Sequence, residues 1–206
     1  MGNFVKHLIE NYGTIGLLLV IFLESGILPA PLPGDSLLFL AGFYSSTKAG
    51  SDLPHLNLAT VVIGSIVVAI AGAQIGYLIG VRFGTRLFTE DAKIFKLKYL
   101  HQSHDFFERR GPAAVVLARF VPFVRTIVPM LAGASTMRAR AFTFANVLGA
   151  VIWAGGISLL GYFLGDHISE SLVEPVTALI VLLSLIPPFL EFRKHQREQR
   201  AQHTES

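Results

Sequence analysis

The chain has 206 residues, of which 52% are hydrophobic and 15% are charged, and its mean hydropathy is +0.56. A soluble domain of this length is far less apolar, so the composition indicates an integral membrane protein. The absence of cysteine excludes disulfides and thiolate metal sites. The net charge of +3 fits membrane orientation better than nucleic-acid binding, because many basic residues fall between 84 and 111 or after Phe192.

The first apolar region, residues 12–46, consists of two short apolar runs on either side of a break. The break contains three prolines flanked by two acidic residues: Glu24, Pro29, Pro31, Pro33 and Asp35. Proline removes a backbone donor and restricts the residue before it, so no helix continues through this cluster. Each arm of about twelve residues spans about 18 Å, which is too short to cross a membrane. We therefore predict a re-entrant hairpin of two half-helices. We also predict that this region is not a signal peptide.

Two long apolar segments, 57–82 and 141–165, are long enough to cross the membrane as tilted helices. In the first, Gly72, Gly76 and Gly80 recur every four residues, which is the small-residue pattern of close helix packing. A shorter apolar run, 173–191, predicts an additional C-terminal span. The basic tail that follows it, 193–206, is then expected in the cytoplasm.

A second broken region, residues 112–137, repeats the form of the first, with Arg119 and Arg125 on either side of Pro122. There is also an echo between the two long segments, because Gly76-Tyr-Leu-Ile-Gly80 matches Gly161-Tyr-Phe-Leu-Gly165. The repeated unit is a hairpin followed by one crossing, so the second copy begins on the opposite side of the membrane, as in inverted-repeat transporters. Chance similarity between glycine-rich helices is the alternative.

The distribution of basic residues predicts the orientation. With one crossing per unit, residues 84–111, the Arg138 and Arg140 segment and the C-terminal tail share one side, and most basic residues lie there. The other side carries Lys6 and Lys48, so the basic side is predicted to be cytoplasmic. Two full crossings in place of each hairpin would give the same distribution.

A helix broken inside a bilayer must be buried in protein or line a water-filled cavity, because lipid offers no partners to its amides. Arg119 and Arg125 lie beside such a break, and their planar guanidinium groups suit bidentate binding of a phosphate headgroup. The alternative is that both arginines snorkel to the cytoplasmic headgroups.

Glu24 and Asp35 are candidate proton carriers, or partners of the arginines, because a carboxylate buried in a membrane is costly and usually functional. Their alternatives are a water-facing carboxylate for Glu24 and a helix N-cap for Asp35. Asn146 and Trp153 share a face of the second long segment and are candidate secondary headgroup contacts, although Asn146 could instead bond across helices. One exposed segment has helically spaced polar residues that more often form a solvated face than a metal site: His101, His104, Asp105 and Glu108.

The two broken segments resemble the signature of the DedA family, also called SNARE-associated or VTT-domain proteins. The matching residues are Glu24 with Pro31-Leu-Pro33-Gly34-Asp35, and Arg119-Phe-Val-Pro122-Phe-Val-Arg125 with Pro129, Ala132 and Gly133, followed by Asn146, Gly149 and Trp153. The resemblance covers about residues 10 to 165. It implies a single all-α membrane domain, 1–192, in which two re-entrant hairpins face each other. It also implies that Glu24, Asp35, Arg119 and Arg125 are essential.

The resemblance further implies a flippase that moves a polyprenyl phosphate, such as undecaprenyl or decaprenyl phosphate, across the bacterial cytoplasmic membrane with proton coupling. We expect membrane lipids and protons as partners, no nucleic acid, no cofactor and no metal, and a homodimer is one option for the oligomeric state. The alternatives are a general phospholipid scramblase, an intramembrane lipid phosphatase and a non-transport membrane organiser. The phosphatase would need a nucleophile or general base near the arginines, and neither hairpin has a histidine.

Overall fold

The computed structural model describes residues 2–27, 34–46, 56–87, 107, 110–135, 137–165 and 167. These residues form helices and turns without a strand, so the predicted all-α class is confirmed for this part of the chain. Several predictions fall outside it: the proline cluster between Ile27 and Gly34, the segment with His101, His104, Asp105 and Glu108, the span 173–191 and the tail 193–206.

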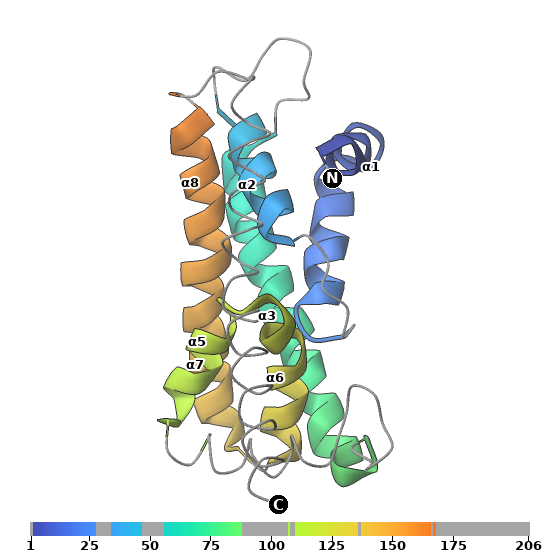
Figure 1. Ribbon diagram of the computed structural model, residues 1–206, viewed down its shortest axis with the longest axis vertical. Coiled ribbons are helices and arrows are strands. Elements are labelled where there is room, and N and C mark those ends of the chain that lie inside the picture. Colours follow the sequence, from blue (N-terminus) through green and yellow to red (C-terminus); the bar gives the residue numbers. More distant parts are fainter. Residues whose placement is uncertain are drawn as a thin grey trace, which may run out of the picture.

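Two long helical rods run along the molecule (Figure 1). The first is α3, Leu58–Phe83, which begins where Asn57 Oδ1 accepts a hydrogen bond from the Thr60 amide at 3.0 Å and ends before Gly84. The second consists of α7, Ala139–Ala150, the π-helical turn η2, Val151–Gly155, and α8, Gly156–Gly165. The rods have 26 and 27 residues, or about 40 Å each, which is enough to cross a membrane.

Two pairs of short helices lie against these rods, one pair in each half of the molecule (Figure 1). The first pair consists of the short arm of α1, Gly2–Glu24, that follows its bend at Gly13, and of α2, Gly34–Tyr44. The second pair is α5, Pro112–Ala118, and α6, Pro122–Ala134, and the short 3-10 helix η1, Gly84–Leu87, follows α3. Both α5 and α6 have proline in their first turn, where no amide hydrogen is needed. The predicted break between the two arginines is therefore present.

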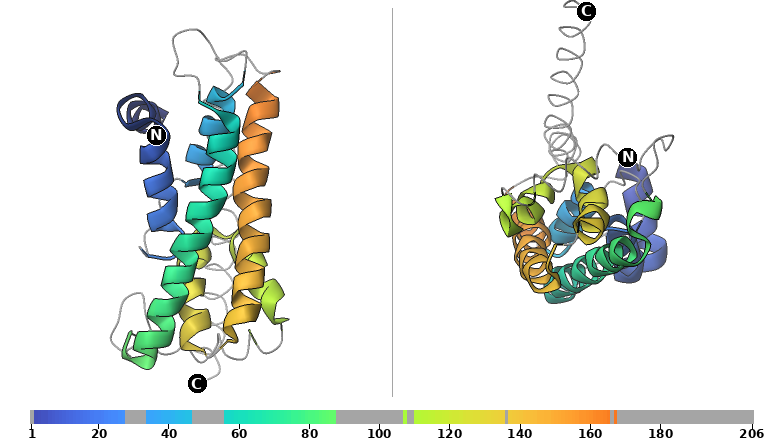
Figure 2. Two further views of the ribbon diagram at one scale, coloured as in Figure 1. Left: turned by 180° about the vertical axis from the view of Figure 1, so that it is seen from behind. Right: turned by 90° about the horizontal axis from the view of Figure 1, so that it is seen from below.

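Each rod contacts helices from both pairs. The first member of each pair packs on the rod that follows it in sequence, α1 on α3 and α5 on α7. The second member packs on the other rod, α2 on α8 and α6 on α3. The view from below in Figure 2 shows the short helices gathered on one side of the two rods.

Gly72, Gly76 and Gly80 of α3 make the close contacts that their spacing predicted. A Cβ atom at Gly72, Gly76 or Gly80 would lie 2.1–2.3 Å from a backbone carbonyl oxygen, of Phe22, Gly26 and Met130 respectively. These oxygens belong to α1, to the turn after it and to α6. The interpretation of this pattern as helix packing is thus confirmed, and it serves both helix pairs.

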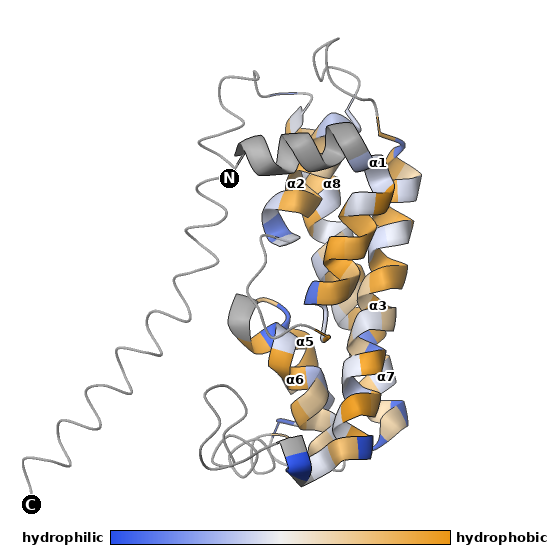
Figure 3. Ribbon diagram, turned by 90° about the vertical axis from the view of Figure 1, so that its right-hand side faces the viewer, coloured by the Kyte–Doolittle hydropathy of each residue, from blue (hydrophilic) through white to orange (hydrophobic). Residues whose placement is uncertain are grey.

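The rods consist largely of apolar residues (Figure 3). Large exposed hydrophobic side chains follow α3 and the second rod, among them Ile63, Val67, Leu78, Phe144 and Phe163. A surface of this kind suits lipid, which offers no hydrogen-bond partners. The buried charged side chains instead lie where the inner ends of the short helices meet.

Candidate functional site

The four predicted charged residues meet at the inner ends of the short helices. Glu24 ends α1, Asp35 lies in the first turn of α2, Arg119 follows α5 and Arg125 lies in the first turn of α6. Their exposed fractions are 1%, 9%, 6% and 5%. Burial inside the protein does not fit the alternative in which the arginines snorkel to the membrane surface.

Arg125 joins the two helix pairs through both acidic residues. Its Nη1 atom donates to Asp35 Oδ1 at 2.6 Å, and its Nη2 atom forms an ion pair with Glu24 Oε1. Buried charges are costly unless they are paired and hydrogen-bonded. The predicted partnership between the acidic residues of the first pair and an arginine of the second is therefore present, and one arginine takes both carboxylates.

Trp153 supports this cluster from the second rod. Its indole Nε1 donates to Asp35 Oδ1 at 2.8 Å, and its ring centroid lies 4.6 Å from Cζ of Arg125 and 5.9 Å from Cζ of Arg119. The tryptophan lies within the π-helical turn, and such turns are frequent at functional sites. Asp35 thus uses its carboxylate oxygen for Arg125 and Trp153.

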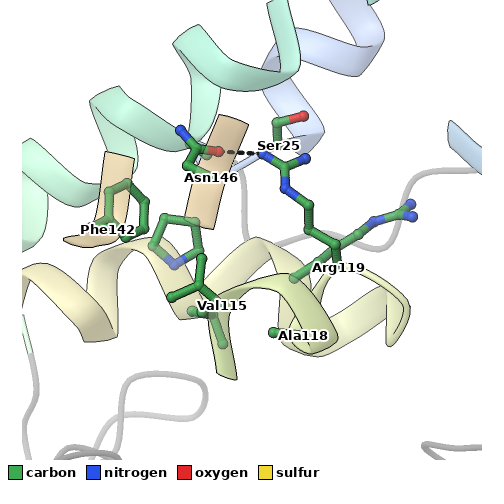
Figure 4. Close-up of a pocket in the computed structure, with 10 residues that line it drawn as sticks. Ser25, Val115, Ala118, Arg119, Phe142 and Asn146 are labelled. Carbon is green, nitrogen blue, oxygen red and sulfur yellow. Dashed lines mark hydrogen bonds between the residues drawn. The ribbon is translucent and has the colours of Figure 1, made fainter. Parts of the chain in front are cut away.

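Arg119 has a different environment. Its Nη2 atom donates to Asn146 Oδ1 at 2.5 Å and to the Ala69 carbonyl at 3.3 Å. Figure 4 shows this side chain extending toward Asn146 beside Ser25. In the described part of the chain, both ion pairs of the site belong to Arg125, and Arg119 has none. The two arginines are therefore not equivalent.

A small cavity lies between the two arginines and the helices around them (Figure 4). Its volume is about 10 Å³, close to the room that one water molecule needs. Its lining is mostly apolar, from Ala73, Val115, Ala118, Val128, Pro129 and Phe142. The polar side chains of the lining are those of Ser25, Arg119, Arg125 and Asn146. A phosphate headgroup does not fit in this conformation. Among the described residues, no group of three histidine or acidic side chains is placed to hold a metal ion.

Sequence reasoning missed two close approaches and the π-helical turn. A Cβ atom at Gly34 would lie 2.0 Å from Glu24 Oε2, and one at Gly149 would lie 2.8 Å from Cδ of Arg119. Both contacts could have been suspected from the sequence, since Gly34 adjoins Asp35 and Gly149 lies one helical turn from Asn146. The π-helical turn has no comparable signal in the sequence.

Comparison with known proteins identifies the family. The VTT domain model matches residues 32–163, more than half of the chain. The protein DedA of Escherichia coli is 38% identical over 200 residues, which cover 94% of this chain and 89% of that protein. An uncharacterized membrane protein of Mycobacterium tuberculosis is 39% identical over 190 residues, covering 90% of this chain and 81% of the relative. The inner membrane protein YqjA of Escherichia coli is 34% identical over 164 residues, covering 76% and 72%.

No solved structure matches the chain. Two of these relatives are named as membrane proteins, and the structure has two helices long and apolar enough to cross a membrane. The match to the domain model and the identity with DedA and YqjA agree with each other and with the residues at the two breaks. The chain therefore belongs to the DedA family of membrane proteins, which carry the VTT domain.

Proposed function

We propose that this protein moves a polyprenyl phosphate, such as undecaprenyl or decaprenyl phosphate, between the leaflets of the bacterial cytoplasmic membrane. The observation that carries the proposal is a buried pair of unlike arginines between two rods of membrane-crossing length. Arg125 is held by two carboxylates, whereas Arg119 is held by a neutral amide and a carbonyl. Guanidinium groups bind phosphate oxygens in a bidentate manner, so Arg119 is the first contact for the headgroup and Arg125 the second.

The packing of the short helices supports an inverted repeat of re-entrant hairpins. Gly80 of α3 packs against Met130 of α6, and Gly161 of α8 packs against Phe39 of α2. In each rod at least one glycine of the echoed motif thus packs against the second member of the helix pair from the other unit, whereas Gly76 packs against Gly26 of its own unit. In inverted-repeat carriers the substrate site lies where the repeats meet, and rocking of one unit against the other exposes it alternately.

The size of the cavity supports a closed resting conformation. With about 10 Å³ of space, the site cannot hold a headgroup until the helix pairs separate. The bridge from Arg125 to Glu24 and Asp35 holds the pairs together. A phosphate oxygen that replaces a carboxylate at Arg125 would therefore both bind the substrate and release this bridge.

Charge balance supports proton coupling. The two arginines and the two carboxylates sum to zero formal charge, so an anion that enters the site leaves it negative, which is costly in a buried environment. Protonation of Glu24 would offset one negative charge of the phosphate. The ion pair with Arg125 uses Glu24 Oε1, which leaves Oε2 as the oxygen that would take the proton.

The site favours transport over phosphate hydrolysis. The described lining of the cavity contains no histidine, and its hydroxyl group, Ser25 Oγ, donates to the Ile21 carbonyl at 2.6 Å. A hydroxyl nucleophile requires a general base nearby. We therefore propose a non-enzymatic, multi-pass transporter. The distribution of basic segments supports a cytoplasmic C-terminus.

The test is leaflet exchange of a fluorescent polyprenyl phosphate in proteoliposomes, with and without a pH gradient. We expect Arg119→Ala and Arg125→Ala to abolish exchange, and Arg138→Ala, which removes an exposed arginine outside the site, to leave it unchanged. Exchange of phosphatidylethanolamine at the same rate, independent of the gradient, would indicate a scramblase instead. Normal exchange by both site variants would contradict the proposal.

A further inference from the structure

We infer that Asn146 is a positioning residue of the anion site, because as a neutral partner it holds Arg119 without cancelling its charge. The inference rests on the proposed function and adds a role for a residue that makes no ion pair. It assigns Asn146 to tuning the binding of a phosphate monoester, whether that phosphate is a lipid headgroup or a free anion.

The hydrogen bonds of Asn146 fix the orientation of its amide. Its Oδ1 atom accepts from Arg119 Nη2, a group that only donates, and its Nδ2 atom donates to the Ile70 carbonyl at 3.0 Å, a group that only accepts. The side chain is fully buried. The oxygen of the amide thus faces the guanidinium, and no rotation of the amide would satisfy both partners.

The backbone of α7 is shaped around the same arginine. Gly149 lies three residues after Asn146 on the same helix face, and the stem of Arg119 crosses it so closely that a Cβ atom would lie 2.8 Å from Cδ. Asn146 and Gly149 together hold Arg119 between α5 and α7, beside the cavity. This face therefore positions the guanidinium where the cavity lies.

The choice of asparagine has an electrostatic consequence. Aspartate has nearly the same shape and would keep an oxygen against Arg119, but it would add a negative charge in direct contact with the guanidinium. The site would then carry a net charge of −1 before any substrate arrived, and the phosphate would compete with a fixed carboxylate. Arg125 already has such carboxylate partners, whereas Arg119 keeps its positive charge available for an incoming anion.

A purely structural role for Asn146 predicts the opposite order of effects. If the residue only linked helices, Asn146→Asp would retain the bond to Arg119 and lose only the bond to Ile70, whereas Asn146→Ala would lose both. The aspartate variant would then be the milder change. If the residue keeps Arg119 available, the aspartate variant is the more damaging change, and the alanine variant keeps a charged and accessible Arg119.

The experiment measures binding of farnesyl phosphate and, separately, of inorganic phosphate to the full-length protein in detergent, by titration calorimetry. Wild type is compared with Asn146→Ala, Asn146→Asp and Gln74→Glu, and the melting temperature of each variant is recorded. Gln74→Glu is the matched control, because it makes the same amide-to-carboxylate change on α3 at a side chain bonded to Thr143.

We expect Asn146→Asp to weaken binding at least tenfold. We expect Asn146→Ala, which loses the orientation of Arg119 but keeps its charge available, to weaken binding less than tenfold, and Gln74→Glu to remain within about threefold of wild type. Preference for farnesyl phosphate would identify a lipid headgroup, and equal binding of both probes would identify free phosphate. Tighter binding by Asn146→Asp than by Asn146→Ala, or a tenfold loss in Asn146→Ala, would overturn the inference. If the aspartate variant does not fold, the strength of phosphate binding by Asn146→Ala still tests the inference. No binding of either probe by folded wild type would overturn the proposed function as well.

Discussion

Arg125 and Asp35 are 90 residues apart in the sequence, yet Nη1 of the arginine lies 2.6 Å from Oδ1 of the aspartate. The arginine belongs to α6 and the aspartate to α2, so their contact joins the two helix pairs at the centre of the molecule. Glu24 adds a second ion pair from α1 to the same guanidinium. Several consequences of this bridge can be measured.

Removal of Arg125 is expected to destabilise the protein strongly. Arg125→Ala leaves two buried carboxylates without their cation, and loss of one partner of a buried ion pair costs about 3–5 kcal/mol. The measurement is thermal or chemical unfolding of the purified protein in detergent.

The matched variant neutralises all three groups together. Arg125→Ala combined with Glu24→Gln and Asp35→Asn leaves no buried unpaired charge, so it should recover much of the lost stability while it remains inactive in leaflet exchange. If the triple variant is as unstable as Arg125→Ala alone, the bridge is not an electrostatic unit.

Trp153 is expected to contribute through its indole N–H as well as through its ring. Trp153→Phe keeps an aromatic face beneath Arg125 and removes the hydrogen bond to Asp35, and a hydrogen bond to a charged group is worth about 1.5–3 kcal/mol. We expect a lower melting temperature and slower leaflet exchange in Trp153→Phe, and a larger loss in Trp153→Ala, which also lacks the cation–π contact. A phenylalanine variant equal to wild type in both assays would show that the hydrogen bond is dispensable.

Two glycines of α8 provide a paired test of helix packing. A Cβ atom at Gly161 would lie 2.1 Å from the Phe39 carbonyl oxygen, whereas one at Gly156 meets nothing within 4 Å. Gly161→Ala should therefore separate α8 from α2 and destabilise the protein, by about 1–3 kcal/mol as for other overpacked interiors. Gly156→Ala should be neutral, or stabilising by up to about 1 kcal/mol from helix propensity. Equal melting temperatures for the two variants would contradict this packing.

Glu24 is expected to carry the response to a pH gradient. Glu24→Gln is uncharged at every pH and resembles the protonated side chain in shape, so this variant cannot gain or lose a proton at this position. We expect leaflet exchange of polyprenyl phosphate by Glu24→Gln to be insensitive to the gradient. A response equal to that of wild type would assign coupling to another group, and Asp35→Asn is the first comparison to make.

The location of the site was predictable from the sequence because charge and proline are rare inside apolar segments. Glu24, Asp35, Arg119, Arg125, Asn146 and Trp153 were all singled out, and the structure places them in one cluster. The family was also predictable, since both broken segments occur in order. The roles of the six residues stay predictions.

The pairing within the cluster was not predictable, because it depends on the relative placement of helices far apart in sequence. The sequence offers two arginines and two carboxylates, which suggests one partner each. Instead Arg125 takes both carboxylates and Arg119 takes Asn146, and the π-helical turn places the Trp153 indole against Asp35. The relative placement of the helices depends on close backbone contacts, such as that of Gly80 with Met130. The local sequence around a glycine does not show which residue of another helix will face it.

The most direct measurement of the central claim is a comparison of headgroups in wild-type proteoliposomes. Three fluorescent lipids with the same polyprenyl chain are tested: the phosphate, the uncharged alcohol and a phosphocholine ester. For each lipid, the exchange rate in protein-free vesicles is subtracted. If the buried arginines select an anion, the remaining rate for the phosphate should be at least tenfold higher than that for either of the other two lipids. Equal exchange of all three lipids, or none of the phosphate, would contradict the claim that this site moves a phosphate headgroup.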